Sequence, residues 1–146
     1  MKNLEIIKHY QTIFSCDQFI LTGSTALKFH GLVDSDSASD IDIILVNPTE
    51  ECKKIIEKLE EKSNKQNTYK ASVAYIFEHE GVKIDIFIET AKTDCCSYEG
   101  VFLNPIKKIV EAKKKIARTK DFAQLRKIAS SILTEKELMT YLDSKA

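Results

Sequence analysis

Leu21-Thr22-Gly23-Ser24-Thr25-Ala26-Leu27, followed by Ser39-Asp40-Ile41-Asp42-Ile43, is the part of the sequence that decides the fold. The first segment predicts a short strand that turns at Gly23-Ser24 into a helix. In the second, Asp40 and Asp42 alternate with isoleucines, so a strand places both carboxylates on one face. Burying two like charges is costly unless a partner neutralises them, and this cost is the first indication of function.

The composition is that of an ordinary globular protein. The chain has 146 residues, of which 43% are hydrophobic and 30% charged, and this length suits one domain, residues 1–146, with its own core. No apolar run reaches the ~18 residues of a membrane span, and polar residues follow Met1 too early for a signal peptide. The four cysteines lack zinc-type spacing, so reduced thiols in the cytoplasm are expected (Cys16, Cys52, Cys95, Cys96).

The charge is unevenly distributed along the chain. Residues 1–104 hold 11 Lys and Arg against 17 Asp and Glu, a net of −6, whereas residues 105–120 hold seven against one, a net of +6. The basic segment 105–120 is either a solvated helix face or a surface for a polyanion such as RNA.

Hydrophobic periodicity and turn residues predict a chain that mixes helices and strands. Strands are expected over 19–21, 40–46, 70–79 and 82–89, and the last two form a hairpin around Glu80-Gly81. Asn47-Pro48 and Asn104-Pro105 predict the starts of two helices, with Asn47 and Asn104 as the capping residues. The expected helices cover 3–14, 24–30, 49–62, 105–117, 120–133 and 135–142, with a polar loop over 33–39. The catalytic sheet with its helices would take 1–104, and 105–146 would be the C-terminal helical part of the same domain.

Three aspartates lie in apolar strand segments. Asp40 and Asp42 call for a cation, and magnesium, which prefers hard oxygen ligands, is the natural one. Asp85, in Lys83-Ile84-Asp85-Ile86, repeats the same pattern in a second strand. If the two strands are neighbours, three carboxylates converge on one face. Gly23 and Ser24 would supply a phosphate site, since glycine permits a close backbone approach and a following helix directs free amides at an anion.

These residues resemble a known group of enzymes. Gly-Ser, Asp-x-Asp and a later apolar-Asp-apolar strand look like the DNA polymerase β-type nucleotidyltransferase superfamily, and within it the small bacterial and phage enzymes akin to AbiEii-type toxins. The resemblance covers 18–46, 82–89 and 105–133. It implies an α+β fold with a central mixed sheet flanked by helices. It also implies two magnesium ions and transfer of a nucleoside monophosphate from a nucleoside triphosphate to an RNA or tRNA end, a protein hydroxyl or a small molecule.

The resemblance also implies roles for particular residues. Gly23 and Ser24 would bind the triphosphate, Asp40 and Asp42 both metals, and Asp85 would complete the metal site or act as base. A lysine followed by a basic segment and a Lys-Asp pair, here Lys113 and Asp121, is similar to the AbiEii-like group. Lys113 falls in a gap of the apolar stripe of its predicted helix, where it either contacts a phosphate or extends to water. Asp121 either points inward or is an acid in the first turn of its predicted helix, where the helix dipole favours a negative charge.

Two departures from the family and one alternative function accompany this interpretation. Thr22 stands where the family usually has a first glycine, and the segment from Ser24 to Asp40 is longer than the minimal form. Neither change removes a group that the chemistry needs. The resemblance is compatible with the toxin of a toxin–antitoxin or phage-defence system, which would have a cognate antitoxin. The alternative is a catalytically silent nucleotide-binding or antitoxin-like module.

Overall fold

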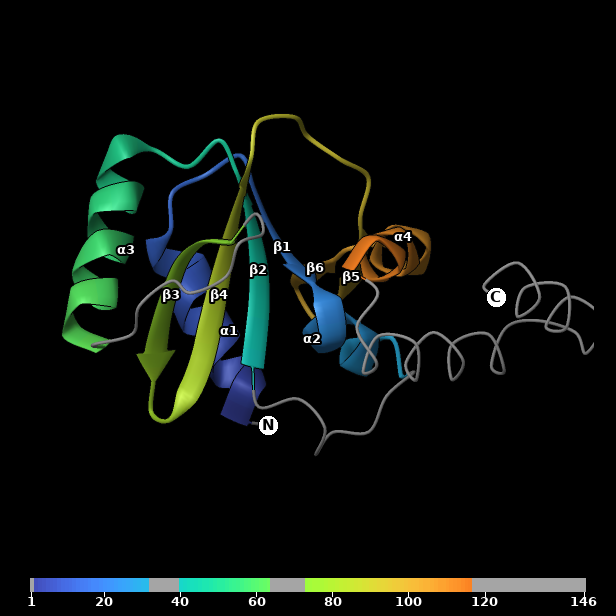
Figure 1. Ribbon diagram of the computed structural model, residues 1–146, viewed down its shortest axis with the longest axis horizontal. Coiled ribbons are helices and arrows are strands. Elements are labelled where there is room, and N and C mark those ends of the chain that lie inside the picture. Colours follow the sequence, from blue (N-terminus) through green and yellow to red (C-terminus); the bar gives the residue numbers. More distant parts are fainter. Residues whose placement is uncertain (1, 32–39, 64–72, 117–146) are drawn as a thin grey trace, which may run out of the picture.

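The computed structural model describes residues 2–31, 40–63 and 73–116, and in the last range it describes side chains up to Glu111. Six strands form one sheet in the order β3-β4-β2-β1-β6-β5 (Figure 1). The strands are β1 (Gln18–Thr22), β2 (Asp40–Val46), β3 (Val73–His79), β4 (Val82–Glu89), β5 (Cys96–Tyr98) and β6 (Val101–Leu103). The helices are α1 (Lys2–Ile13), α2 (Gly23–Phe29), α3 (Glu50–Ser63) and α4 (Ile106–Ile116).

The sheet is mixed. β2 runs parallel to β4 and β1 runs parallel to β6, whereas the other neighbouring pairs are antiparallel. The predicted hairpin is confirmed, because β3 and β4 pair around Glu80 and Gly81. Both turn residues have positive φ, 51° and 83°, as a two-residue type I′ turn requires. The two short strands β5 and β6 were not predicted from the sequence.

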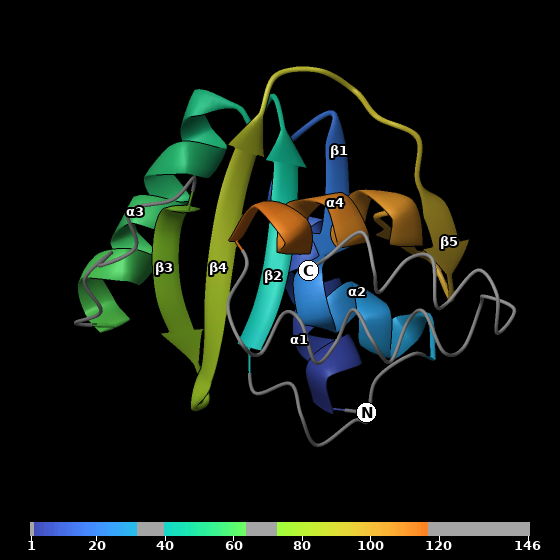
Figure 2. The ribbon, with the colours of Figure 1, turned by 45° about the vertical axis from the view of Figure 1, so that its right-hand side comes forward.

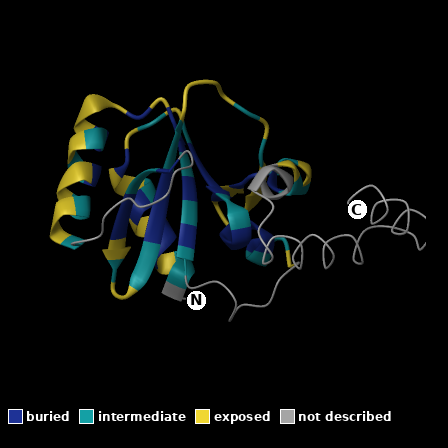
Figure 3. Ribbon diagram, viewed as in Figure 1, coloured by how far each residue is buried: buried dark blue, intermediate teal, exposed yellow. Residues whose placement is uncertain are grey.

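Helices cover both faces of the sheet. Figure 1 shows α1 behind the strands and Figure 2 shows α4 in front of them, while α3 packs beside β3. The α1 side chains Ile7 and Tyr10, which are 0% and 2% exposed, pack in the same core as the rear face of β2 and β4. Figure 3 shows this buried centre against the exposed outer side of α3. The core therefore fixes which face of β2 turns away from α1.

One predicted helix start differs from the structure. The hydroxyl of Thr49, and not the side chain of Asn47, accepts a hydrogen bond from the Cys52 N–H at 3.1 Å and caps α3. Asn47 has a φ of 49° and instead donates to Asp17 and to the Thr90 carbonyl, both at 3.0 Å. The predicted helices over 120–133 and 135–142 and the loop over 33–39 lie outside the described residues. Within the described part of the chain, no helix has the length and apolar content needed to cross a bilayer.

Candidate nucleotide and metal site

The three strand aspartates come together on one face of the sheet. In the parallel pair of β2 and β4, Asp42 is the register partner of Asp85, and Asp40 is the partner of Lys83. Because strand side chains alternate, all four polar groups share the face opposite the buried isoleucines. The condition set by the sequence, that the two strands be neighbours, is met.

The turn after β1 lies against one of these carboxylates. β1 pairs with β2 so that Thr22 is opposite Asp42, and Gly23 follows with a φ of 59°. A Cβ built on Gly23 would lie 2.5 Å from Oδ2 of Asp42, closer than side-chain atoms approach one another. Glycine is therefore required at this position both for its backbone conformation and for the space it leaves. The neighbouring Ser24 is buried, with 8% of its surface exposed.

Thr25 fastens α2 to β2 at the site. Its hydroxyl donates a hydrogen bond to the carbonyl of Asp40 at 3.0 Å and accepts one from the N–H of Asp42 at 3.1 Å. Thr25 is 1% exposed, so water does not compete for these bonds. The backbone that carries the Asp-x-Asp pair is thus held by a residue that the sequence did not single out.

Lys83 is a second residue that the sequence did not single out. Its ammonium lies 3.6 Å from Oδ2 of Asp40 and 3.7 Å from Oδ2 of Asp85. Burial raises the pKa of Asp85, whose residue surface is 6% exposed, and the charge of Lys83 acts in the opposite direction. The signal for Lys83 was present, since it precedes Asp85 by two residues and must share its face.

The two oxygens of Asp85 have different surroundings. Oδ2 faces Lys83, whereas Oδ1 is buried and has no hydrogen-bond partner among the described residues. No group of three or more His, Cys, Asp or Glu side chains within the described ranges is arranged to hold a metal ion. The three carboxylates thus share a face, but a lysine is inserted between two of them.

A polar network links this turn to the start of α4. The side-chain amide of Asn104 donates to the hydroxyl of Thr22 at 3.1 Å, and its backbone N–H donates to the Leu21 carbonyl at 2.8 Å. Nε2 of His30 lies 2.9 Å from the Asn104 carbonyl oxygen. Asn104, predicted as a helix cap, therefore uses its side chain to hold the end of β1.

The structure describes only part of the two predicted C-terminal site residues, Lys113 and Asp121. Lys113 lies in α4, but its side chain is outside the described atoms, and Asp121 lies outside the described residues. On the part of α4 whose side chains are described, Ile109 is buried and Ile106 and Val110 pack against the core. This agrees with the apolar stripe from which the inward position of Lys113 was predicted.

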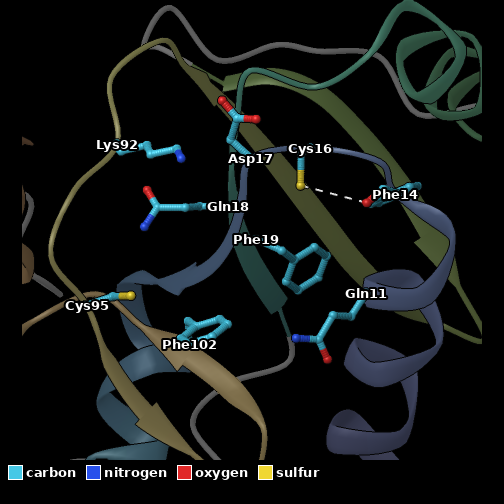
Figure 4. Close-up of a pocket in the computed structure, with 9 residues that line it drawn as sticks. All are labelled: Gln11, Phe14, Cys16, Asp17, Gln18, Phe19, Lys92, Cys95 and Phe102. Atoms are coloured by element: carbon cyan, nitrogen blue, oxygen red, sulfur yellow. Dashed lines mark hydrogen bonds between the residues drawn. The ribbon is translucent and has the colours of Figure 1, made fainter.

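A shallow pocket of about 400 Å³ lies elsewhere in the molecule (Figure 4). Its lining includes Phe14, Phe19 and Phe102, with Gln18 and Lys92 among its polar groups. It includes none of the predicted site residues. The carboxylate cluster, whose oxygens can coordinate a cation, is therefore the better candidate for the catalytic site.

No protein family and no curated protein matches the chain. Among solved structures, the chain is similar to the solution structure of the antibiotic-resistance factor ANT(2'')-Ia, an aminoglycoside nucleotidyltransferase, with a TM-score of 0.58. The match covers 99% of this chain and 93% of that one at 15% sequence identity, so the likeness concerns the fold. The predicted nucleotidyltransferase fold is confirmed. The AbiEii-type subfamily stays a prediction.

Proposed function

We propose that the chain is a magnesium-dependent nucleotidyltransferase that transfers a nucleoside monophosphate from a nucleoside triphosphate to an acceptor. The observation that carries this proposal is the register pairing of Asp42 with Asp85 on parallel strands, directly beside the Gly23-Ser24 turn. The fold shared with ANT(2'')-Ia supports it.

The residues present fit a magnesium ion. Asp40, Asp42 and Asp85 offer hard carboxylate oxygens, and the buried Oδ1 of Asp85, without a hydrogen-bond partner in the described residues, needs a cationic or donor partner. Asp42 and Asp85, which are register partners, would hold the ion, and Asp40 lies beside them opposite Lys83. When bound, magnesium neutralises phosphate charge and stabilises the attacking and leaving oxygens of a phosphoryl-type displacement.

The protein groups have distinct tasks in this reaction. Gly23 and Ser24 would bind the triphosphate, and a side chain at position 23 would instead collide with Oδ2 of Asp42. An acceptor hydroxyl oxygen bonds to the α-phosphorus, the bond to pyrophosphate breaks, and the hydroxyl proton passes to a carboxylate. By the family resemblance, Asp85 either completes the metal site or acts as the base that takes this proton. Lys113 and Asp121 are proposed to assist in binding the phosphates.

The acceptor is proposed to be RNA, such as the end of a tRNA. The segment 105–120 carries seven Lys and Arg against one acid, and clustered cations neutralise a phosphate backbone. Lys107, on α4, is exposed to solvent. A toxin role with a protein antitoxin in the cytoplasm is proposed along with this activity. All four cysteines lie in the described ranges and are free thiols, which suits that compartment.

Label transfer tests the proposal. The protein is incubated with each labelled nucleoside triphosphate and magnesium, with total RNA, a protein mixture or aminoglycosides supplied as separate acceptors. We expect label on RNA, and none with the Asp40→Asn, Asp42→Asn double variant. The exposed Asp94→Asn serves as the matched control and should transfer label as the wild type does.

Two results would contradict the proposal. Transfer that survives the double substitution would remove the carboxylates from the site. Tight, magnesium-dependent triphosphate binding without transfer to any acceptor would instead identify the alternative, a catalytically silent binding module.

A further inference from the structure

Lys83 lies between two of the three aspartates of the candidate metal site. It stands opposite Asp40 in the parallel register, two residues before Asp85 on the same strand. Its ammonium lies at nearly equal distances, 3.6 and 3.7 Å, from one oxygen of each of these aspartates. Its side chain is 24% exposed, so the ion pair is partly shielded from water. A cation therefore already bridges two of the three carboxylates.

The remaining part of the site still requires a cation. Oδ1 of Asp85 is buried without a hydrogen-bond partner among the described residues, although Oδ2 of the same carboxylate faces Lys83. Asp42 is the register partner of Asp85, and its Oδ2 fills the space that Gly23 leaves open. Magnesium in proteins is commonly held by one or two carboxylates together with water and phosphate oxygens. Asp42 and Oδ1 of Asp85 meet that requirement.

The charges balance with one ammonium and one divalent ion. Three carboxylates carry −3, Lys83 carries +1, and one divalent ion adds +2, which sums to zero before any nucleotide binds. A second divalent ion in the nucleotide-free protein would have to displace the ammonium or share its carboxylates, and like charges at such separations repel.

We propose that Lys83 is a built-in cation of this site and takes the place of one of two divalent ions, so that the nucleotide-free protein binds a single divalent ion through Asp42 and Asp85. This inference rests on the proposed function. Lys83 is then a positioning residue, which holds Asp40 and one oxygen of Asp85 while the other oxygen stays available for the ion.

Manganese binding to the nucleotide-free protein tests the inference without any measurement of activity. Free Mn²⁺ is followed by electron paramagnetic resonance during titration of the full chain. We expect one bound ion in the wild type and two in Lys83→Met, because the substitution removes the competing charge. Lys83→Arg keeps the charge and should bind one ion. Lys53→Met removes the partner of Glu50 on α3 and is the matched control, which should also bind one.

Aspartate variants keep the inference testable if Lys83→Met does not fold, as judged by circular dichroism. Asp40→Asn should retain the single ion and Asp42→Asn should lose it. Equal numbers of bound ions in wild type and Lys83→Met, or two ions in the wild type, would overturn the inference and leave the proposed function standing. No ion bound to any variant at millimolar Mn²⁺ would overturn both.

Discussion

Replacing Gly23 with alanine tests whether the turn and the carboxylates form one site. The substitution imposes two separate costs. The φ of 59° places alanine in the left-handed region, which costs roughly 1–2 kcal/mol. The added Cβ would also lie 2.5 Å from Oδ2 of Asp42, whereas ordinary contact begins at 3.4 Å. The carboxylate must therefore move by about 0.9 Å, the difference between these two distances.

A shift of this size affects the reaction more than the stability. Misplacing a reacting group by about 1 Å can cost on the order of 100-fold in rate. We therefore expect Gly23→Ala to remain folded, with a loss of roughly 1–2 kcal/mol in the free energy of unfolding measured in urea. We expect label transfer to fall by about 100-fold in the same variant.

Gly81→Ala is the matched control for this experiment. Gly81 has a φ of 83°, and a Cβ there would meet nothing within 4 Å among the described residues. This variant should lose a similar amount of stability but should keep wild-type transfer and Mn²⁺ binding. If Gly23→Ala transferred label as fast as Gly81→Ala, the close approach of Gly23 to Asp42 would be irrelevant to function, and the turn would have to be removed from the site.

Three further predictions concern the hydrogen bonds of Thr25 beside the site, the packing of Phe77 in the core and the reactivity of the Cys16 thiol. Thr25→Val removes both hydrogen bonds to β2 and should lower the free energy of unfolding in urea by about 1–3 kcal/mol; Thr25→Ser, which keeps the hydroxyl, should lose clearly less. Phe77→Ala, at a 0% exposed position, should cost about 3–5 kcal/mol, and a loss below about 1 kcal/mol would show that this core packing is wrong. Burial raises the pKa of the Cys16 thiol to about 11, so only about one thiol in a thousand is ionised at pH 8. In mass spectra of iodoacetamide-treated protein, the exposed Cys96 should be labelled well before Cys16, and the reverse order would contradict the burial of Cys16.

Local sequence patterns predicted most of the elements correctly. Asp40–Val46 is β2 with the predicted bounds, because alternating isoleucines and polar residues have no other regular conformation that buries one face. The hairpin around Glu80-Gly81 followed from two apolar runs joined by a two-residue turn. The cap of α3 was assigned wrongly, since Asn47 and Thr49 are both good capping residues and tertiary contacts of Asn47 with Asp17 and Thr90 decided between them.

The two short strands β5 and β6 were not predicted from the sequence for a physical reason. β5 and β6 have three residues each, and β5 is fully exposed, so neither shows a periodic apolar face long enough to recognise. β6 is positioned by pairing with β1, which is distant in sequence, and β5 is positioned by pairing with β6. Strand pairing of this kind is a property of the folded chain.

The sequence by itself determined the ingredients of the site: a glycine turn, two aspartates on one strand face, and a third aspartate in a similar strand. Side-chain alternation is a local property of an extended backbone, so these assignments needed no partner. Only the tertiary structure decided that β2 and β4 are parallel neighbours with Asp42 opposite Asp85, because α3 and β3 separate them in the chain. The same register placed Lys83 opposite Asp40, and this pairing converts three carboxylates into a cluster that already holds one positive charge.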